Sequence, residues 1–166
     1  VEFGTRCGRC TNDILRALLQ NGESFVFKPY EVEDPLREIS QRNIDTVFDS
    51  FSIPIGGNIM LATDIPDEID YLFVDNSHDY ETTKWVFETL LPGRVKDGAL
   101  IHFHDLVIHN DFEFTLPASN NVPVKGEMLY FYESKKQGKF PLEKVYWGWE
   151  EGGPISSTWW RYRKKK

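Results

Sequence analysis

The segment from residue 69 to residue 105 constrains the fold more than any other part of the chain. An apolar run at Tyr71–Val74 ends in Asp75, a helical pattern follows over Tyr80–Leu91, and a second apolar run covers Ala99–Phe103. Short apolar runs bounded by turn residues are typical of buried strands, and a strand–helix–strand order is typical of a parallel βαβ unit. We therefore predict two parallel strands joined by a crossover helix, with His104 and Asp105 at the end of the second strand.

The same alternation continues on both sides of this segment. Val1–Phe3 predicts a strand, and a helical pattern follows with Thr11 as its N-cap and Gly22 as its stop. Residues 24–33 and 34–43 predict a second strand and a second helix, and TVFDSF predicts a weak third strand. Near the C-terminus, KVYWGW and STWWRYR predict an antiparallel hairpin. We therefore expect a doubly wound, mostly parallel, Rossmann-like α/β sheet with a C-terminal antiparallel hairpin.

Length and charge limit the organisation and the partners of the chain. Its 166 residues fit one domain over positions 1–166, and we expect an N-terminal part to precede Val1, which already lies in a predicted strand. The net charge of −7 disfavours nucleic-acid binding, because phosphate backbones require a basic face. No apolar run reaches the roughly 20 residues of a membrane span, and no leader is evident. Two closely spaced cysteines favour a reducing cytoplasm, so we expect a cytoplasmic protein with a small-molecule ligand and no membrane partner.

Polar residues follow the predicted strands at their carboxyl ends, where open parallel sheets bind ligands. The first strand gives the pattern E-x-G-x-x-x-G with Glu2, Gly4 and Gly8, and such glycines let the backbone approach a ligand at a helix N-terminus. An acid at the end of the second strand, Glu33 first and Glu31 second, can accept the hydroxyls of a ribose. The pattern favours a ribose-containing cofactor, with a plain βα turn as the alternative.

Two segments, VEFGTRCGRCT…RALLQNG and IDYLFVDNSHDYE…LLPGRVKDGALIHFHD, resemble class I S-adenosylmethionine (SAM)-dependent methyltransferases, most of all small-molecule and sugar O-methyltransferases. The resemblance covers Val1 to Asp105 and implies methylation of a small-molecule or sugar hydroxyl with SAM as cofactor. The adenine contact has no clear equivalent, and Asp49 is only a candidate. The cofactor-binding residues that the resemblance implies are Glu2, Gly4, Thr5, Gly8, Glu33 and Asp75.

Four residues after the later strands carry the catalytic hypothesis. In similar cation-dependent O-methyltransferases, acids in the places of Asp75 and Asp105 hold Mg²⁺, which prefers oxygen ligands. His104 would complete such a metal site, although an imidazole fits Mn²⁺, Fe²⁺ or Zn²⁺ better. His78 stands in the place of the general base of related sugar O-methyltransferases, and Asp75 would assist it. The alternatives are a metal-free Asp75 beside the cofactor and a His104 bonded to the backbone.

Other functions compete with this interpretation. Cys7 and Cys10, at a strand-to-helix turn, fit a thioredoxin- or glutaredoxin-like dithiol oxidoreductase, but TVFDSF lacks the proline that this fold requires. A cofactor-binding domain without catalysis is a second alternative, because acceptor choice depends on loops and on N-terminal segments. The tail WWRYRKKK suggests RNA binding less strongly than it suggests a final strand with a solvated end.

Overall fold

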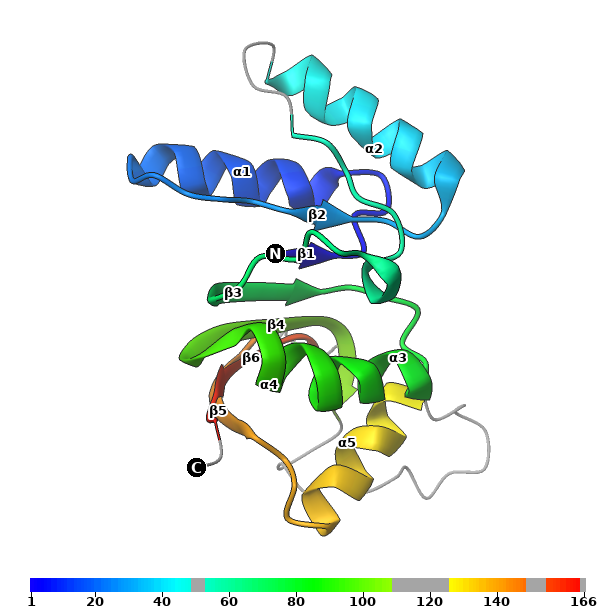
Figure 1. The fold of residues 1–166 in the computed structure, drawn as a ribbon, viewed down its shortest axis with the longest axis vertical. Helices are drawn as coiled ribbons and strands as arrows, with labels where there is room; N and C mark the ends of the chain where they lie inside the picture. The colour runs from blue at the N-terminus through cyan, green and yellow to red at the C-terminus, as the bar shows by residue number, and fades with distance from the viewer. Residues whose placement is uncertain (49–52, 109–125, 149–154, 165–166) are drawn as a thin grey trace. The chain divides into compact units, whose positions relative to one another are not determined.

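The computed structural model describes residues 1–48, 53–108, 126–148 and 155–164. The chain divides into two compact units, Val1–Pro66 and Asp67–Lys166 (Figure 1). The prediction of one domain over residues 1–166 therefore stays a prediction. Within the described ranges, no helix is long and apolar enough to cross a membrane.

The described part of the first unit contains two parallel strands, two α-helices and a short 3-10 helix. Strand β1 (Glu2–Phe3) pairs with β2 (Pro29–Tyr30), with Glu2 opposite Pro29. Helices α1 (Arg9–Asn21) and α2 (Asp34–Val47) follow these strands, so the strand–helix alternation predicted for this region is present. Leu15, Phe27, Ile44 and Ile53 form a hydrophobic core cluster in this unit.

The start of α1 differs from the prediction, whereas its end agrees. Gly8 is the N-cap, at a φ of 81°, and Thr11 is buried inside the helix, so the prediction of Thr11 as the N-cap is wrong. Glycine adopts this left-handed conformation without steric cost, which lets the chain turn into the helix three residues earlier than a threonine cap would. Gly22 ends the helix at a φ of 72°, as predicted.

The third strand predicted from TVFDSF is wrong for its first two residues, because Thr46 and Val47 belong to α2. Helix α2 buries Ser40 and Ile44, and the Thr46 hydroxyl donates a hydrogen bond to the backbone oxygen of Arg42 within the same helix. Residues 49–52 lie outside the described residues, and Asp49 is among them. The second strand is also shorter than expected. It includes only Pro29–Tyr30, and Tyr30 forms a parallel bridge to Gly56. The short 3-10 helix η1 (Ile59–Leu61) follows.

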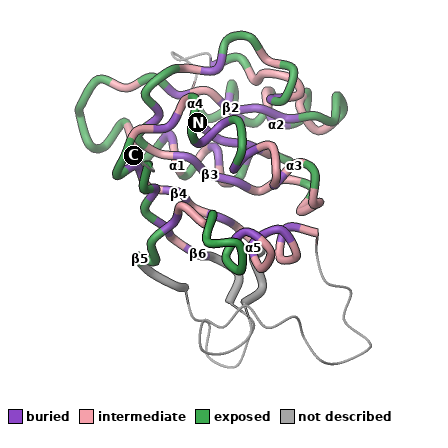
Figure 2. Tube along the Cα trace, turned by 60° about the horizontal axis from the view of Figure 1, so that its bottom comes forward, coloured by how far each residue is buried: buried purple, intermediate pink, exposed green. Residues whose placement is uncertain are grey.

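The second unit contains the predicted parallel pair and the predicted hairpin. Residue Val74 of one parallel strand lies opposite Phe103 of the other, and the last two strands pair antiparallel with Gly148 opposite Ser157. Figure 2 shows buried residues along both parallel strands. The four strands are β3 (Ile69–Val74), β4 (Val95–Ile108), β5 (Leu142–Gly148) and β6 (Ile155–Tyr162).

Strand β4 is longer than predicted, since it begins before Ala99 and continues past Phe103. Its antiparallel partner β6 explains the extension past Phe103, because His104 lies opposite Ser157 and Ile108 lies opposite Ile155. A paired neighbour satisfies the backbone groups beyond the end of the apolar run. His104 therefore lies inside the strand rather than at its end, and so does the backbone of Asp105.

Helices of the second unit cover one face of its strands with aromatic side chains. The ring of Phe103 on β4 lies 6.2 Å from that of Phe87 and 5.1 Å from that of Phe131, measured between centroids. Phe103 and Phe131 are fully buried. The helical segments are α3 (Tyr80–Trp85), the π-helical turn η2 (Val86–Leu90) and α4 (Leu91–Arg94), which run on from one another, and α5 (Gly126–Lys136) (Figure 1).

Candidate functional site

The turn that follows β3 holds its residues in defined positions. Asp75 comes directly after the strand, and His78 has a φ of 54°, which is uncommon for a residue other than glycine. The backbone N–H of His78 donates to Oδ1 of Asn76 at 2.9 Å, an interaction that supports this conformation. Asp79 then caps α3 by accepting a hydrogen bond of 2.7 Å from the backbone N–H of Thr82. The turn therefore fixes the direction in which the His78 side chain leaves the backbone.

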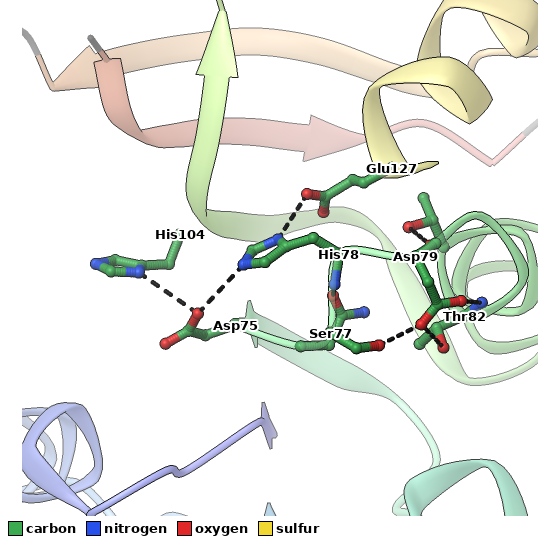
Figure 3. Close-up of polar contacts among 9 residues, drawn as sticks. Asp75, Ser77, His78, Asp79, Thr82, His104 and Glu127 are labelled. Carbon is green, nitrogen blue, oxygen red and sulfur yellow. Dashed lines mark hydrogen bonds and ion pairs between the residues drawn. The ribbon is translucent and has the colours of Figure 1, made fainter. Parts of the chain in front are cut away.

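Hydrogen bonds keep the Asp79 carboxylate, which caps α3, in its ionised form. Burial acts to raise the pKa of Asp79, but hydrogen bonds from Ser77 and Thr82 outweigh burial and leave this pKa below its ordinary value. The Ser77 hydroxyl and both the N–H and the hydroxyl of Thr82 donate to the Asp79 carboxylate (Figure 3). Asp79 is therefore ionised near neutral pH and keeps the start of α3 in place.

The His78 ring lies between two carboxylates (Figure 3). Its Nδ1 is 2.8 Å from Oε2 of Glu127 on α5, and its Nε2 is 3.8 Å from Oδ1 of Asp75. The side chains of His78 and Asp75 are each 16% exposed, whereas that of Glu127 is 1% exposed. One nitrogen of the imidazole thus faces a buried acid, and the other faces an acid that solvent reaches.

Asp75 also contacts a second imidazole. Nδ1 of His104 lies 3.5 Å from the same Oδ1 of Asp75 that faces His78. The structure therefore brings together three residues predicted from the sequence for catalysis or metal binding: Asp75, His78 and His104. The side chain of the fourth, Asp105, is outside the described part of the structure.

His102, two residues before His104 on β4, differs from it in its surroundings. Its ring stacks on Trp159 with centroids 4.0 Å apart, and its Nδ1 lies 3.3 Å from the Tyr71 hydroxyl. Burial first and the neighbouring His104 second lower the pKa of His102 to about 4. His102 is therefore neutral at pH 7 and packs as an aromatic side chain.

The predicted cofactor residues of the first unit lie on β1 and in the turn after it. Glu2 and Thr5 are buried, and Gly4 and Gly8 have φ values of 94° and 81°. A Cβ atom on Gly8 would lie 2.7 Å from Oγ of Ser40, so a larger residue would displace α2 or the turn. Residues other than glycine rarely adopt such positive φ values, so the backbone of this turn favours glycine at both positions.

The two candidate acids after β2 occupy different environments. Glu31 is buried, and its carboxylate accepts hydrogen bonds from the backbone N–H groups of Arg6 at 2.7 Å and of Glu33 at 3.1 Å. Glu33 is the N-cap of α2, makes no side-chain cap hydrogen bond and is exposed. Glu31 therefore joins the turn after β1 to the segment after β2, whereas the side chain of Glu33 faces solvent.

Glu127 is the site residue that sequence reasoning missed. It lies 49 residues from His78 along the chain, in the first turn of a helix, where an acid is common for electrostatic reasons alone. No motif connects GEMLYFYESKK to the turn after β3. The burial of Glu127 can be recognised only once the packing of α5 is known.

The comparisons with known proteins agree with the predicted fold. A family model described as a methyltransferase domain matches residues 1–106. The structure of TomG, an O-methyltransferase from Streptomyces achromogenes involved in tomaymycin synthesis and in complex with SAM, shares 16% identity with a TM-score of 0.66, over 98% of this chain and 71% of that one. Cofactor-bound Rv0187 from MTB shares 16% identity with a TM-score of 0.62, over 99% of this chain and 72% of that one. No curated protein matches the chain in sequence. The Rossmann-like α/β fold predicted from the sequence is thereby confirmed.

Proposed function

Because the chain belongs to the methyltransferase domain family and is a class I SAM-dependent methyltransferase, we propose that it methylates a hydroxyl group of a small molecule or sugar. The observation that carries the proposal is the His78 ring held beside Asp75 at the end of β3. Methyl transfer to oxygen requires a group that removes the hydroxyl proton, and a partly exposed imidazole can do so. TomG, the O-methyltransferase with a similar fold, supports an oxygen acceptor.

In the proposed reaction, His78 acts as the general base. The acceptor oxygen forms a bond to the methyl carbon as the carbon–sulfur bond breaks, and the hydroxyl proton passes to the imidazole. SAM, when bound, supplies the electrophilic methyl group and leaves as a neutral thioether. Asp75, whose Oδ1 is 3.8 Å from Nε2 of His78, can accept a hydrogen bond from a second hydroxyl of a diol acceptor and so hold the acceptor in place. Positioning of this kind accounts for a large part of the rate in reactions between two bound groups.

We place the cofactor against the turn after β1 and the acid after β2. Glu2, Gly4, Thr5 and Gly8 belong to that turn or precede it, and Glu31 is hydrogen-bonded to its Arg6. The Glu31 carboxylate has further lone pairs, so it can accept a ribose hydroxyl as well. Of the two acids we therefore put Glu31 first and keep Glu33, the first choice from the sequence, as the second.

Replacing Glu31 by Ala should weaken SAM binding by about 10- to 150-fold, because a charge-assisted hydrogen bond contributes about 1.5–3 kcal/mol. The matched control is Glu33→Ala, which removes an exposed acid two residues away and should leave the affinity within a few-fold. Isothermal calorimetry with SAM and with S-adenosylhomocysteine measures both. A larger loss in Glu33→Ala than in Glu31→Ala would restore the original choice, and binding of NADH or FAD in place of SAM would overturn the proposed function.

The proposed reaction assigns no step to a divalent cation. Asp75 and His104 are close to each other, but among the residues the structure describes no group of three or more His, Cys, Asp and Glu could hold a metal ion. The described side chains alone do not make up a metal site, and no step of the proposed reaction depends on one. The metal role predicted for Asp75, His104 and Asp105 stays a prediction.

A double Cys7→Ser, Cys10→Ser variant should keep its SAM affinity within a few-fold, because the proposed reaction uses neither sulfur. Cys7 is exposed and Cys10 is partly buried, and both are thiols rather than halves of a disulfide. The measurement is calorimetry on both proteins, together with an assay for reduction of a disulfide substrate. Efficient reduction by the wild type that disappears in the variant would favour the dithiol oxidoreductase. A reducing cytoplasmic location stays a prediction.

A further inference from the structure

We infer that Glu127 is a positioning residue that sets the orientation and the tautomer of the His78 ring. The inference rests on the proposed function, in which His78 is the general base. Glu127 itself need not touch the acceptor or the cofactor. Its role would be to leave Nε2 of His78 unprotonated and directed toward the place where the hydroxyl binds.

Two separate hydrogen bonds join Glu127 to His78. The carboxylate oxygen Oε2 is 2.8 Å from the ring nitrogen Nδ1, and the backbone N–H of Glu127 donates to the backbone oxygen of His78 at 3.0 Å. Glu127 is fully buried, so solvent competes little with either contact. Both the ring and the backbone of His78 are therefore held by one residue of α5.

The start of α5 lies close against the turn that carries His78. A Cβ atom on Gly126 would contact the backbone nitrogen of Tyr80 and would lie 3.0 Å from the carbonyl carbon of Asp79, so only glycine fits at this position. Further along α5, Glu133 accepts a hydrogen bond of 2.7 Å from the Tyr80 hydroxyl. The close approach at Gly126 supports the uncommon φ of 54° at His78 from outside the turn itself.

The contact with Glu127 decides which ring nitrogen carries the proton. The inference includes an ionised Glu127 carboxylate, which only accepts hydrogen bonds, so that Nδ1 is the donor and Nε2 holds the lone pair. Nε2 then faces Oδ1 of Asp75 at 3.8 Å, and neither of these two acceptors can donate to the other. A hydroxyl placed here could donate its proton to Nε2. With the opposite tautomer, Nε2 would donate to Asp75 and could not remove a proton.

The tautomer can be measured without a known acceptor. The full chain, labelled with ¹⁵N-histidine, gives two-bond ¹H–¹⁵N correlation spectra that distinguish a protonated ring nitrogen from an unprotonated one, and His78→Gln assigns the signals. We expect wild-type His78 to be protonated at Nδ1 only, with the same spectrum when S-adenosylhomocysteine is added. In Glu127→Ala the Nδ1–H form should be lost in favour of Nε2–H. In Glu127→Gln both forms should appear, because an amide can accept or donate.

Glu133→Gln is the matched control, since it removes a carboxylate from the same helix and leaves the His78 contact intact. Its spectrum should equal that of the wild type. If Glu127→Ala does not fold, Glu127→Gln, which keeps the shape of the side chain, still decides the result. An Nε2–H tautomer in the wild type, or an unchanged tautomer in both folded Glu127 variants, would overturn the inference. Calorimetry with SAM on the same samples tests the proposed function separately, because a chain that does not bind SAM could still show the expected tautomer.

Discussion

His78→Ala should lower the turnover of methyl transfer by about 10²- to 10⁴-fold, the usual effect of removing a general base. The affinity for SAM should stay within a few-fold, because the residues proposed to bind the cofactor lie mainly in the turn after β1 and at Glu31. A loss confined to turnover indicates an interaction that acts in the transition state. The His78 ring is 16% exposed and makes its closest polar contact with Glu127 of α5, so the change removes no hydrogen bond between strands.

Turnover is measured as the formation of S-adenosylhomocysteine with a panel of phenols, catechols and sugars, using the acceptor that the wild type methylates fastest. His78→Gln refines the test, because a glutamine side chain can donate to Glu127 but cannot take up the proton. It should lose as much turnover as His78→Ala, whereas Glu133→Gln should keep it. If His78→Ala retains turnover close to that of the wild type, another group removes the proton and the mechanism proposed here is wrong.

The sequence predicted the part of the site that depends on local structure. Tyr71–Val74 is a continuous apolar run, so the strand and the position of Asp75 at its end follow directly from the pattern. The helix predicted from Tyr80 onward does begin at Tyr80, which leaves His78 in the connecting turn. Residues within four or five positions of a strand end are close to it in any fold that forms the strand. The positions of Asp75 and His78 in the turn after β3 could therefore be predicted from the sequence pattern alone.

The remaining parts depend on contacts between distant segments. Glu127 reaches His78 only because α5 packs against α3, and no local pattern specifies that packing. Strand β4 continues past Phe103 because β6 pairs with it, although the apolar pattern of the strand alone ends there. TVFDSF contains β-branched and aromatic residues, yet its Thr46 and Val47 continue α2, whose buried face includes Ile44. In each case tertiary packing overrides the local preference.

Phe103→Ala should lower the free energy of unfolding by about 3–5 kcal/mol, as is usual for removal of a fully buried phenylalanine. Its ring is in contact with Phe87 of η2 and Phe131 of α5, so the truncation leaves a cavity between β4 and both helical segments. Phe87 and Phe131 also contact each other, with centroids 5.0 Å apart, and cannot both move into that space without losing their own packing. Most of the cavity should therefore remain unfilled.

Urea denaturation followed by tryptophan fluorescence measures the loss, and Leu61→Ala is the control. Leu61 is 80% exposed, so its truncation should change the free energy of unfolding by no more than about 0.5 kcal/mol. The ¹⁵N spectrum of His78 adds a second measurement, because α5 carries both Phe131 and Glu127. A Phe103→Ala variant that still folds should show weakened Nδ1–H signals, since a loosened α5 holds the Glu127 carboxylate less firmly against the ring. A loss below about 1 kcal/mol would show that the aromatic core repacks around the gap and does not fix the position of α5.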